Sequence, residues 1–160
     1  MMKKIPLSRN MDALVDDEDY EMLSKYKWYA TKGANTYYAI RHNPRNKEKQ
    51  TLTLMHRFIL NVPDGMVTDH IDQDGLNNQK HNLRICTRTQ NNRNMKLYNS
   101  NTSGYRGVYY DNRVNKWYSH IQVNGVALHI GMYFTKEDAA MAYNDAAIKH
   151  HGDFASLNIV

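Results

Sequence analysis

The sequence predicts a small α+β protein, and three features of its 160 residues indicate this class. Short aromatic and β-branched runs separated by polar turns fill residues 1–60, which is typical of strands. Residues 61–95 have the pattern of a strand, a long polar loop, a second strand and a helix. From residue 105, three further strand-like runs precede one alanine-rich helical stretch. The length leaves room for two or three very small modules.

The N-terminal region, residues 1–53, is expected to be small and β-rich. One short helix is predicted from Asp17 to Tyr26, because its acidic start and its lysines near the end suit the helix dipole. Polar turn residues, including Gly33 and Pro44, separate the strand-like runs. These runs are LSRNMDALVD (7–16), YKWYAT (26–31), TYYAIRH (36–42) and QTLTLMHRFIL (50–60).

The middle of the chain changes character at residue 61. The segment 61–86 is polar with one short apolar run at each end, which predicts strand, polar loop, strand. A helix is expected to begin at Thr87. Thr87 and Gln90 have the spacing of a capping box, in which each side chain satisfies a free backbone donor of the first helical turn.

The C-terminal part, residues 104–160, follows an Asn- and Ser-rich linker at 96–103. Its three strand-like runs are 105–111, 116–123 and 126–134, and Asn124-Gly125 is a strong hairpin signal because both residues tolerate positive φ. A helix is predicted from Thr135, which can cap it, to His151, with Gly152 ending it. One face of this helix is suited to lying close on a sheet: Ala139, Ala142, Tyr143, Ala146 and Ala147.

Composition limits the class of protein. The single cysteine, Cys86, excludes an internal disulfide and a cysteine-rich zinc site, and indicates a reducing cytoplasm. No stretch approaches the roughly 20 apolar residues that span a bilayer, and the N-terminus lacks the apolar core of a signal peptide. We therefore expect no membrane partner.

The net charge of +5 indicates a polyanionic partner, and its distribution is uneven. Six basic residues against the one acidic Asp111 lie between residues 83 and 113, so this stretch carries an excess equal to that of the whole chain. A nucleic acid crossing it would meet cations from the helix, the linker and the next strand. The six are Arg84, Arg88, Arg93, Lys96, Arg106 and Arg113.

Four residues of the central segment carry the chemistry. Asp69 and His70 end the first strand, Asn82 closes the polar loop, and Asn91 lies one turn into the capped helix. If the helix folds back on the first strand, Asp69 and Asn91 offer two oxygens to a hard ion such as Mg²⁺ or Mn²⁺. His70 titrates near neutrality and can take a proton from water, which suits phosphodiester hydrolysis.

Several alternatives stay open at this point. Asp72 and Asp74 rival Asp69 for the metal, although both suit the turn before Gly75. His56 could approach the metal or a phosphate, or could pack on a strand. Arg57 could contact phosphate or simply lie at a strand edge, and His81 could belong to the site or face solvent. Trp28 and Trp117 could stack on bases or pack in the core.

The motifs D-H-I-D, H-N-L-R and Q-N-N resemble those of HNH endonucleases, the ββα-metal nucleases, over residues 54–95. The likeness is to the phage homing-endonuclease branch, in which the last histidine of the motif is replaced by asparagine. The resemblance implies that His70 is the general base and Asn82 the loop-bracing asparagine. It implies that Asp69 and Asn91 are the metal ligands.

The C-terminal motifs Y-R-G-V, K-W, G-M-Y-F and E-D-A-A-M-A-Y-N-D-A-A resemble the DNA-binding domain of plant APETALA-two and ethylene-response factors. This resemblance implies a three-stranded sheet packed on one helix, with the sheet in the DNA major groove. Arg106 matches a DNA-reading arginine of that family. Tyr109, Asp111, His120, Gln122 and His129 depart from its usual residues, so the plant target sequence does not transfer. Tyr109, Arg113, His120 and Gln122 are nonetheless expected to contact DNA.

Together these features predict a metal-dependent endonuclease of double-stranded DNA, encoded by a phage or mobile element and acting in the bacterial cytoplasm without a small-molecule cofactor. The predicted DNA contacts also include Arg57 and the basic residues of 84–96. The alternative is a non-catalytic, sequence-specific DNA-binding regulator with a decayed nuclease finger, and RNA is a third possible target. The oligomeric state, monomer or homodimer, is left open.

Overall fold

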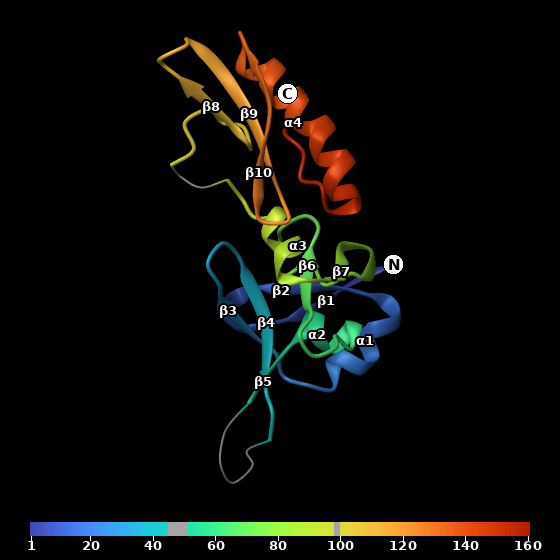
Figure 1. Cartoon of the computed structure of the whole chain (residues 1–160). Coiled ribbons are helices and arrows are strands. Elements are labelled where there is room, and N and C mark those ends of the chain that lie inside the picture. The colour runs from blue at the N-terminus through green and yellow to red at the C-terminus, as the bar shows by residue number, and fades with distance from the viewer. Residues whose placement is uncertain (45–50, 98–99) are drawn as a thin grey trace. The chain divides into compact units, whose positions relative to one another are not determined.

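The computed structural model describes residues 1–44, 51–97 and 100–160, which form two compact units, Met1–Asn92 and Arg93–Val160 (Figure 1). Gln50, where one predicted strand run begins, and residues 98–99 of the predicted linker lie outside the described residues. None of the helices in the described part has the length and apolar character needed to cross a membrane.

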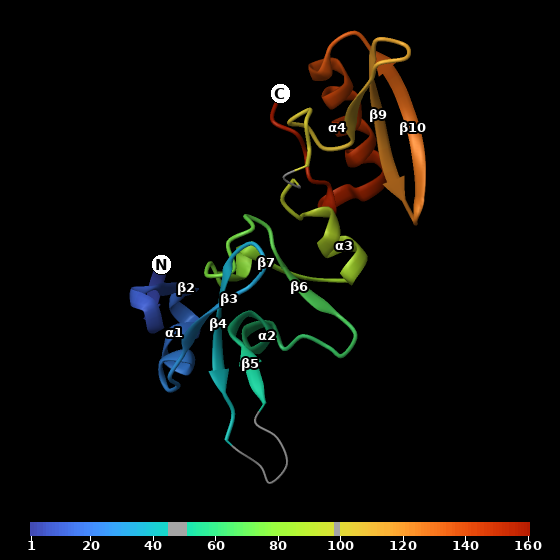
Figure 2. The same ribbon diagram turned by 90° about the vertical axis from the view of Figure 1, so that its left-hand side faces the viewer.

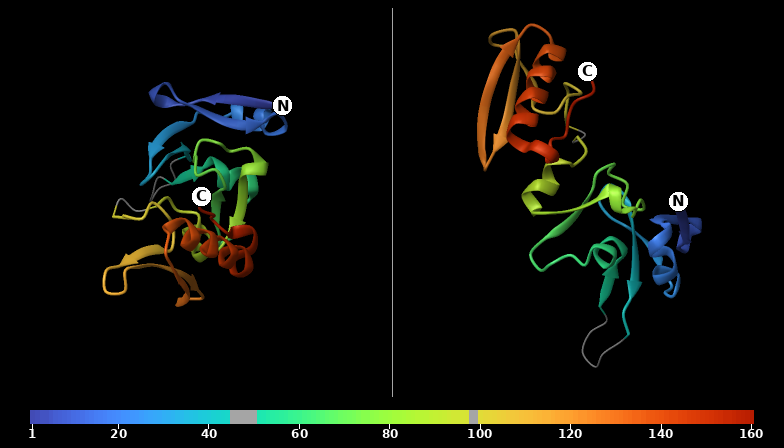
Figure 3. Two further views of the ribbon diagram at one scale, coloured as in Figure 1. Left: turned by 90° about the horizontal axis from the view of Figure 1, so that it is seen from above. Right: turned by 90° about the vertical axis from the view of Figure 1, so that its right-hand side faces the viewer.

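The first unit begins with a hairpin. Strand β1 (Met2–Pro6) pairs antiparallel with β2 (Asp12–Asp16), a short 3-10 turn (Ser8–Asn10) connects them, and helix α1 (Asp17–Ser24) follows. Figure 3 shows α1 beside this hairpin. The predicted helix is confirmed, ending at Ser24 rather than Tyr26. Strand β1 was not predicted, because MKKIP has two lysines and only Ile5 of the strand is buried.

A second sheet of the first unit has the order β3-β4-β5, with β3 Tyr29–Lys32, β4 Tyr37–His42 and β5 Leu52–Leu54, all antiparallel. The strand prediction is wrong for the residues that follow, because Met55–Leu60 form helix α2. The apolar residues Met55, Phe58 and Ile59 recur with the helical period and pack on the core. The strand prediction rested on the content of β-branched and aromatic residues and did not take this period into account.

The hydrophobic core of the first unit joins its N-terminal elements to α2. Trp28 is 2% exposed, and its indole nitrogen donates to the Leu23 carbonyl at 2.9 Å, so this residue packs in the core rather than stacking on bases. The core residues are Ile5, Ala13, Val15, Leu23, Trp28, Ala39 and Met55.

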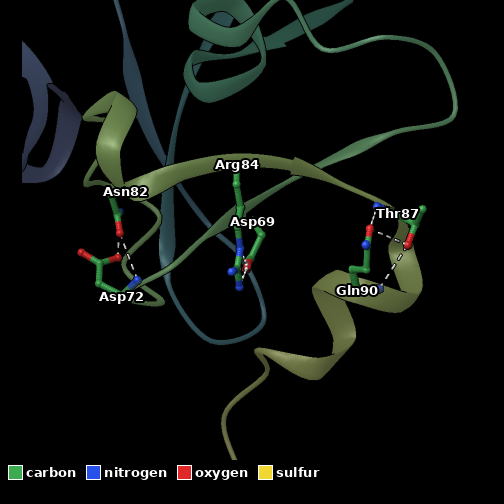
Figure 4. A network of polar contacts seen from close by, with 6 residues as sticks. All are labelled: Asp69, Asp72, Asn82, Arg84, Thr87 and Gln90. Carbon is green, nitrogen blue, oxygen red and sulfur yellow. Dashed lines mark hydrogen bonds and ion pairs between the residues drawn. The ribbon is translucent and has the colours of Figure 1, made fainter. Parts of the chain in front are cut away.

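The last elements of the first unit follow the predicted order. Strands β6 (Val67–His70) and β7 (Leu83–Cys86) pair antiparallel across the polar loop, which ends in a 3-10 turn at Lys80–Asn82. Helix α3 (Arg88–Arg93) comes next. The capping box is confirmed: Thr87 N donates to Gln90 Oε1 at 2.8 Å, and Gln90 N donates to Thr87 Oγ1 at 3.2 Å (Figure 4).

The second unit is a sheet with the order β10-β9-β8, and helix α4 (Lys136–His151) lies along one face of it (Figure 2). The strands β8 (Val108–Asp111), β9 (Lys116–Val123) and β10 (Val126–Tyr133) confirm the three predicted ones. Asn124 and Gly125 have φ of 51° and 83°, as a tight hairpin turn requires.

Helix α4 also has the predicted ends and buried face. The Thr135 hydroxyl accepts from Asp138 N, and Gly152 follows the last turn with φ 54° before a short 3-10 turn at Gly152–Phe154. The buried residues of α4 are Ala139, Ala140, Tyr143, Ala147 and His151, so Ala142 and Ala146 lie at the margin of the packed face. The C-terminal tail is held by Asn158, whose side chain bonds the backbone N–H and carbonyl of Arg106.

Candidate active site

The β6–β7 hairpin places Asp69 directly opposite Arg84. The Asp69 carboxylate is nearly buried at 3% exposure, and its Oδ2 accepts from Arg84 Nε at 2.7 Å and lies 2.6 Å from Arg84 Nη2. Figure 4 shows this pair between the Asp72–Asn82 contact and the α3 capping box. Arg84, which we expected to contact DNA, therefore neutralises the carboxylate expected to bind a metal.

Asn82 braces the polar loop from within. Its Oδ1 accepts from Asp72 N at 3.0 Å, and its Nδ2 donates to Asp72 Oδ1 and to the Asn77 carbonyl, both at 2.9 Å (Figure 4). Asp72 in turn accepts from Asp74 N and from Asn77 Nδ2, so its carboxylate serves the loop. Asn82 thereby fixes the backbone that follows His70.

The N-terminal strands hold the other side of the loop. Leu14 N donates to the Leu76 carbonyl at 2.8 Å and Asn78 N donates to the Leu14 carbonyl at 2.7 Å, which joins the loop to the edge of β2. Gly75 N donates to Thr36 Oγ1 at 3.0 Å, next to β4. The N-terminal region thus acts as a scaffold for the loop, a role that no sequence motif indicated.

His70 lies at the end of β6 and is 6% exposed. Its ring meets the His56 ring edge-on, at 5.0 Å between centroids and 88° between planes, and the Tyr38 ring at 5.9 Å. Burial lowers the pKa of His70 below its ordinary 6.5, against the opposing effects of a side-chain hydrogen bond with Asn78 and of nearby carboxylates. The imidazole is therefore neutral near pH 7, the form that accepts a proton.

His56 lies in the first turn of α2 and not on a strand as predicted. It is buried, and within the described part of the chain its Nδ1 has no hydrogen-bond partner. Burial is the main cause that lowers the pKa of His56 to about 3, and the nearby charges of His70 and Arg57 lower it further. The neighbouring Arg57 is also helical, and it donates to the carbonyls of Met66 and Val62, where it supports the segment before β6.

The buried His56 predicts a loss of stability in acid. Its pKa is about 3 when folded and 6.5 when unfolded, so between these values the unfolded chain binds the extra proton. His56 therefore lowers the free energy of unfolding, by up to about 1.4 kcal/mol per pH unit, as pH falls from 6.5 toward 3. The wild type should lose stability over this range more steeply than His56→Phe, which keeps a ring in place.

Urea unfolding from pH 7 to pH 4 measures this difference. A Trp117→Phe background leaves Trp28 as the reporter of the first unit. Carboxylates contribute equally to both proteins, so only the difference in slope concerns His56. Parallel pH profiles for the two proteins would show that His56 is protonated in the folded state.

Asn91, the second predicted metal ligand, lies on α3. The Cys86 thiol receives backbone hydrogen bonds from both Asn91 and Asp69. Helix α3 and the end of β6 therefore both contact the Cys86 sulfur. Cys86 is 1% exposed, and burial raises its pKa. In the described residues no three His, Cys, Asp or Glu side chains cluster as metal ligands. The predicted set, one carboxylate and one amide, still offers oxygens of the kind that hard ions take.

The other basic residues predicted to bind DNA fall into two groups. Arg106 donates to the Met95 carbonyl, and Arg113 pairs with Asp111, which lowers the pKa of Asp111 to about 2. Arg88 and Lys96 are exposed, and Arg93 is half-buried. Exposed cations can meet phosphate without giving up a contact within the protein.

The face of the second sheet opposite α4 carries an aromatic ladder, which we define as Tyr109, Tyr118, His120 and His129. Tyr109 stacks on Tyr118 at 5.3 Å and 16°, and meets His120 at 5.5 Å. Tyr118 meets His129 at 5.2 Å. Gln122 is exposed on the same strand, two residues after His120. Trp117 instead packs beside Val108 on the helix side of the sheet.

Two residues that contact His70 were not predicted. Tyr38 reaches it from β4, and Asn78 reaches it from within the loop. Asn78 is fully buried, an unusual state for asparagine that a sequence pattern does not reveal. The alternation of side chains along β4 predicts that Tyr38 and the buried Ala39 lie on opposite faces. It does not predict that Tyr38 lies beside His70, which is 32 residues later in the chain.

Comparison with known proteins assigns the family. Residues 61–93, which hold the β6–β7 hairpin and α3, match the HNH endonuclease family. An uncharacterized HNH endonuclease of Acanthamoeba polyphaga mimivirus is 32% identical over 152 residues, which cover 91% of this chain and 74% of that protein. The chain belongs to the HNH endonuclease family. This HNH protein is also 32% identical over 94 residues to Protein 3.8 of Escherichia phage T7, covering 59% of the chain and 77% of the phage protein.

Two further relatives are of another kind. An AP2-like ethylene-responsive transcription factor of Arabidopsis thaliana is 41% identical over 61 residues, which are 38% of this chain and 13% of the plant protein. APETALA2-like protein 2 of Oryza sativa subsp. indica is 42% identical over 59 residues, 14% of its length. The HNH protein thus matches only a small part of each plant protein.

Proposed function

We propose that this HNH protein is a metal-dependent endonuclease that hydrolyses phosphodiester bonds in duplex DNA. The placement of His70 carries the proposal: a buried imidazole, neutral near pH 7, stands next to the buried Asp69 carboxylate on a hairpin that Asn82 braces. The family match over residues 61–93 supports it. A neutral histidine beside a carboxylate is the arrangement that activates water next to a bound cation.

Each residue of the site has one task in this proposal. His70 accepts the proton of the attacking water at a nitrogen of its neutral imidazole ring. Asn78 and the rings of His56 and Tyr38 hold the imidazole in orientation. Asn82 keeps the loop closed after His70, so that the base does not drift from the phosphate.

HNH endonucleases generally use a divalent metal ion. Asp69 and Asn91 would hold it here, because carboxylate and amide oxygens suit Mg²⁺ or Mn²⁺. When bound, the ion supplies positive charge for the phosphate and the leaving 3′-oxygen. The Asp69 Oδ2 already accepts a cationic group, since it contacts Nε and Nη2 of Arg84, and this supports the proposal that it can hold a metal ion.

We further propose that residues 104–160 form an APETALA-two-like DNA-binding domain, joined by a linker at 96–103 to the nuclease motif at 54–95. The sheet packed on one helix and the plant matches over about 60 residues support this domain. Its free face would enter the major groove with Tyr109, His120 and Gln122. Arg88, Arg93 and Lys96 would contact phosphate of the same duplex.

One observation favours the second candidate, a DNA-binding regulator without nuclease activity. Arg84 engages the carboxylate that would bind the metal, as a cation substituting for a lost ion would do. The two candidates differ in one respect. Only the nuclease requires the Asp69 carboxylate to bind Mg²⁺, either together with Arg84 or after the Arg84 contact is broken.

Incubation of the full chain with supercoiled plasmid separates the candidates. With Mg²⁺ or Mn²⁺ the nuclease converts the plasmid to open-circular or linear form, and EDTA stops the conversion. The regulator binds duplex DNA in a mobility-shift assay but leaves a library of phage and plasmid sequences uncut with either metal. Competition by RNA as strong as that by duplex DNA would instead favour an RNA target.

A further inference from the structure

Tyr38 stands at the candidate active site although it lies in the N-terminal strand region. It belongs to β4, where it pairs with Thr31 of β3. Its ring lies 5.7 Å from the His56 ring and 5.9 Å from the His70 ring, and the two histidines are 5.0 Å apart. The three rings therefore contact one another, with the Tyr38 ring slightly farther from the proposed base than the His56 ring is.

Two glycines pack closely against the Tyr38 ring, one at each edge. A Cβ added to Gly33 would lie 2.6 Å from Tyr38 Cε2, and one added to Gly75 would lie 2.6 Å from Tyr38 Cδ1 and Cε1. Gly33 lies in the turn before β4 and Gly75 in the loop between β6 and β7, so two separate backbones confine the ring. A ring held in this way has little freedom to turn its hydroxyl elsewhere.

The hydroxyl of Tyr38 keeps its hydrogen-bonding capacity. In the described part of the chain it makes no hydrogen bond, and it is not among the buried side-chain oxygens that lack a partner, so it is accessible to solvent. Burial of the ring and then the negative charge of Asp69 raise the pKa of Tyr38 above its ordinary 10. The phenol is thus protonated at neutral pH and acts as a hydrogen-bond donor.

We propose that the Tyr38 hydroxyl donates a hydrogen bond to a non-bridging oxygen of the phosphate that is attacked by the water His70 deprotonates. This inference rests on the proposed nuclease function and adds a catalytic residue from outside residues 61–93. The chemistry favours such a donor: the non-bridging oxygens are anionic acceptors, and a fixed neutral donor stabilises them without opposing the metal charge. A purely structural tyrosine would need the ring alone.

Tyr38→Phe tests the proposal because it keeps the ring between the two glycines and removes one oxygen. Tyr37→Phe is the matched control, since Tyr37 precedes it on β4 with its side chain on the opposite face. Single-turnover cleavage of plasmid with saturating protein and Mg²⁺ should fall about 100-fold in Tyr38→Phe and remain at the wild-type rate in Tyr37→Phe. The dissociation constant for DNA and the thermal midpoint should stay unchanged.

The outcomes separate this inference from the function on which it rests. A wild type that cuts while Tyr38→Phe cuts within twofold of it overturns the role of the hydroxyl and leaves the nuclease standing. A wild type inactive with both metals overturns the nuclease and the hydroxyl role together. A slower Tyr38→Phe that also binds DNA more weakly or melts earlier assigns the residue to structure and overturns its catalytic role.

Discussion

Asp69→Asn should abolish metal-dependent cleavage while leaving DNA binding in place. The substitution keeps the size of the side chain but removes the one carboxylate of the proposed metal pair. Loss of an outer-shell partner costs roughly 10- to 100-fold in metal affinity or activity, so loss of a charged ligand should cost more than about 100-fold. The measurement is the cleavage rate as a function of Mg²⁺ concentration.

Asp74→Asn is the matched control for this prediction. Asp74 is an exposed loop carboxylate whose Oδ1 accepts from Leu76 N, a bond that an asparagine oxygen can keep. Its Mg²⁺ dependence should match that of the wild type. The reverse result, with Asp74→Asn inactive and Asp69→Asn active, would place the metal on the turn residue and contradict the site described above.

Gly107→Ala should unfold much of the second unit. Gly107 has φ of 70°, and a Cβ there would overlap the buried Tyr143 ring and the backbone carbonyl of His120 in β9. A left-handed backbone at a non-glycine residue costs about 1–2 kcal/mol and overpacking about 1–3 kcal/mol, so the sum is roughly 2–5 kcal/mol. DNA binding should weaken with it, since the same strands carry the aromatic ladder.

Gly125→Ala isolates the backbone part of that cost. Gly125 has φ of 83°, but no atom lies within 4 Å of an added Cβ, so only about 1–2 kcal/mol is expected. Hydrogen exchange of the β8–β10 amides, read by mass spectrometry, reports the opening free energy of this unit separately from the first. Equal losses in the two variants would mean that Tyr143 and His120 move aside without cost.

The second unit was the easier part to predict, because its signals are local. Asn124-Gly125 determines a hairpin turn by its own backbone preferences, and Thr135 caps α4 through the Asp138 N–H three residues later. The capping box of α3 is local in the same sense. Each of these features depends on residues within one turn of the chain, so the sequence displays them directly.

The errors in the first unit have a tertiary origin. Strand β1 is paired on one side only, to β2, and its lysines hide the strand pattern. Helix α2 contains phenylalanine and isoleucine, which favour strands in isolation, and it is helical because Met55, Phe58 and Ile59 share one face on the core. Long-range packing outweighs local propensity at both elements.

The candidate site shows the same division. The spacing of Asp69, His70 and Asn82 indicated a hairpin closed by an asparagine, and the structure has this hairpin. The contacts of Tyr38, His56 and Arg84 with these residues arise from pairing and packing between distant segments. Sequence spacing carries no information on such contacts, which is why Arg84 was expected on DNA and Tyr38 was not expected at the site.

The most direct test of the account is the cleavage rate of His70→Ala beside His81→Ala, with equal Mg²⁺ and a supercoiled plasmid that the wild type cuts. His81 is exposed in the turn before Asn82, whereas His70 is buried at the end of β6. The account predicts a rate lower by roughly 10²- to 10⁴-fold in His70→Ala, with DNA binding retained, and an unchanged rate in His81→Ala. Cleavage by His70→Ala at the wild-type rate would contradict it.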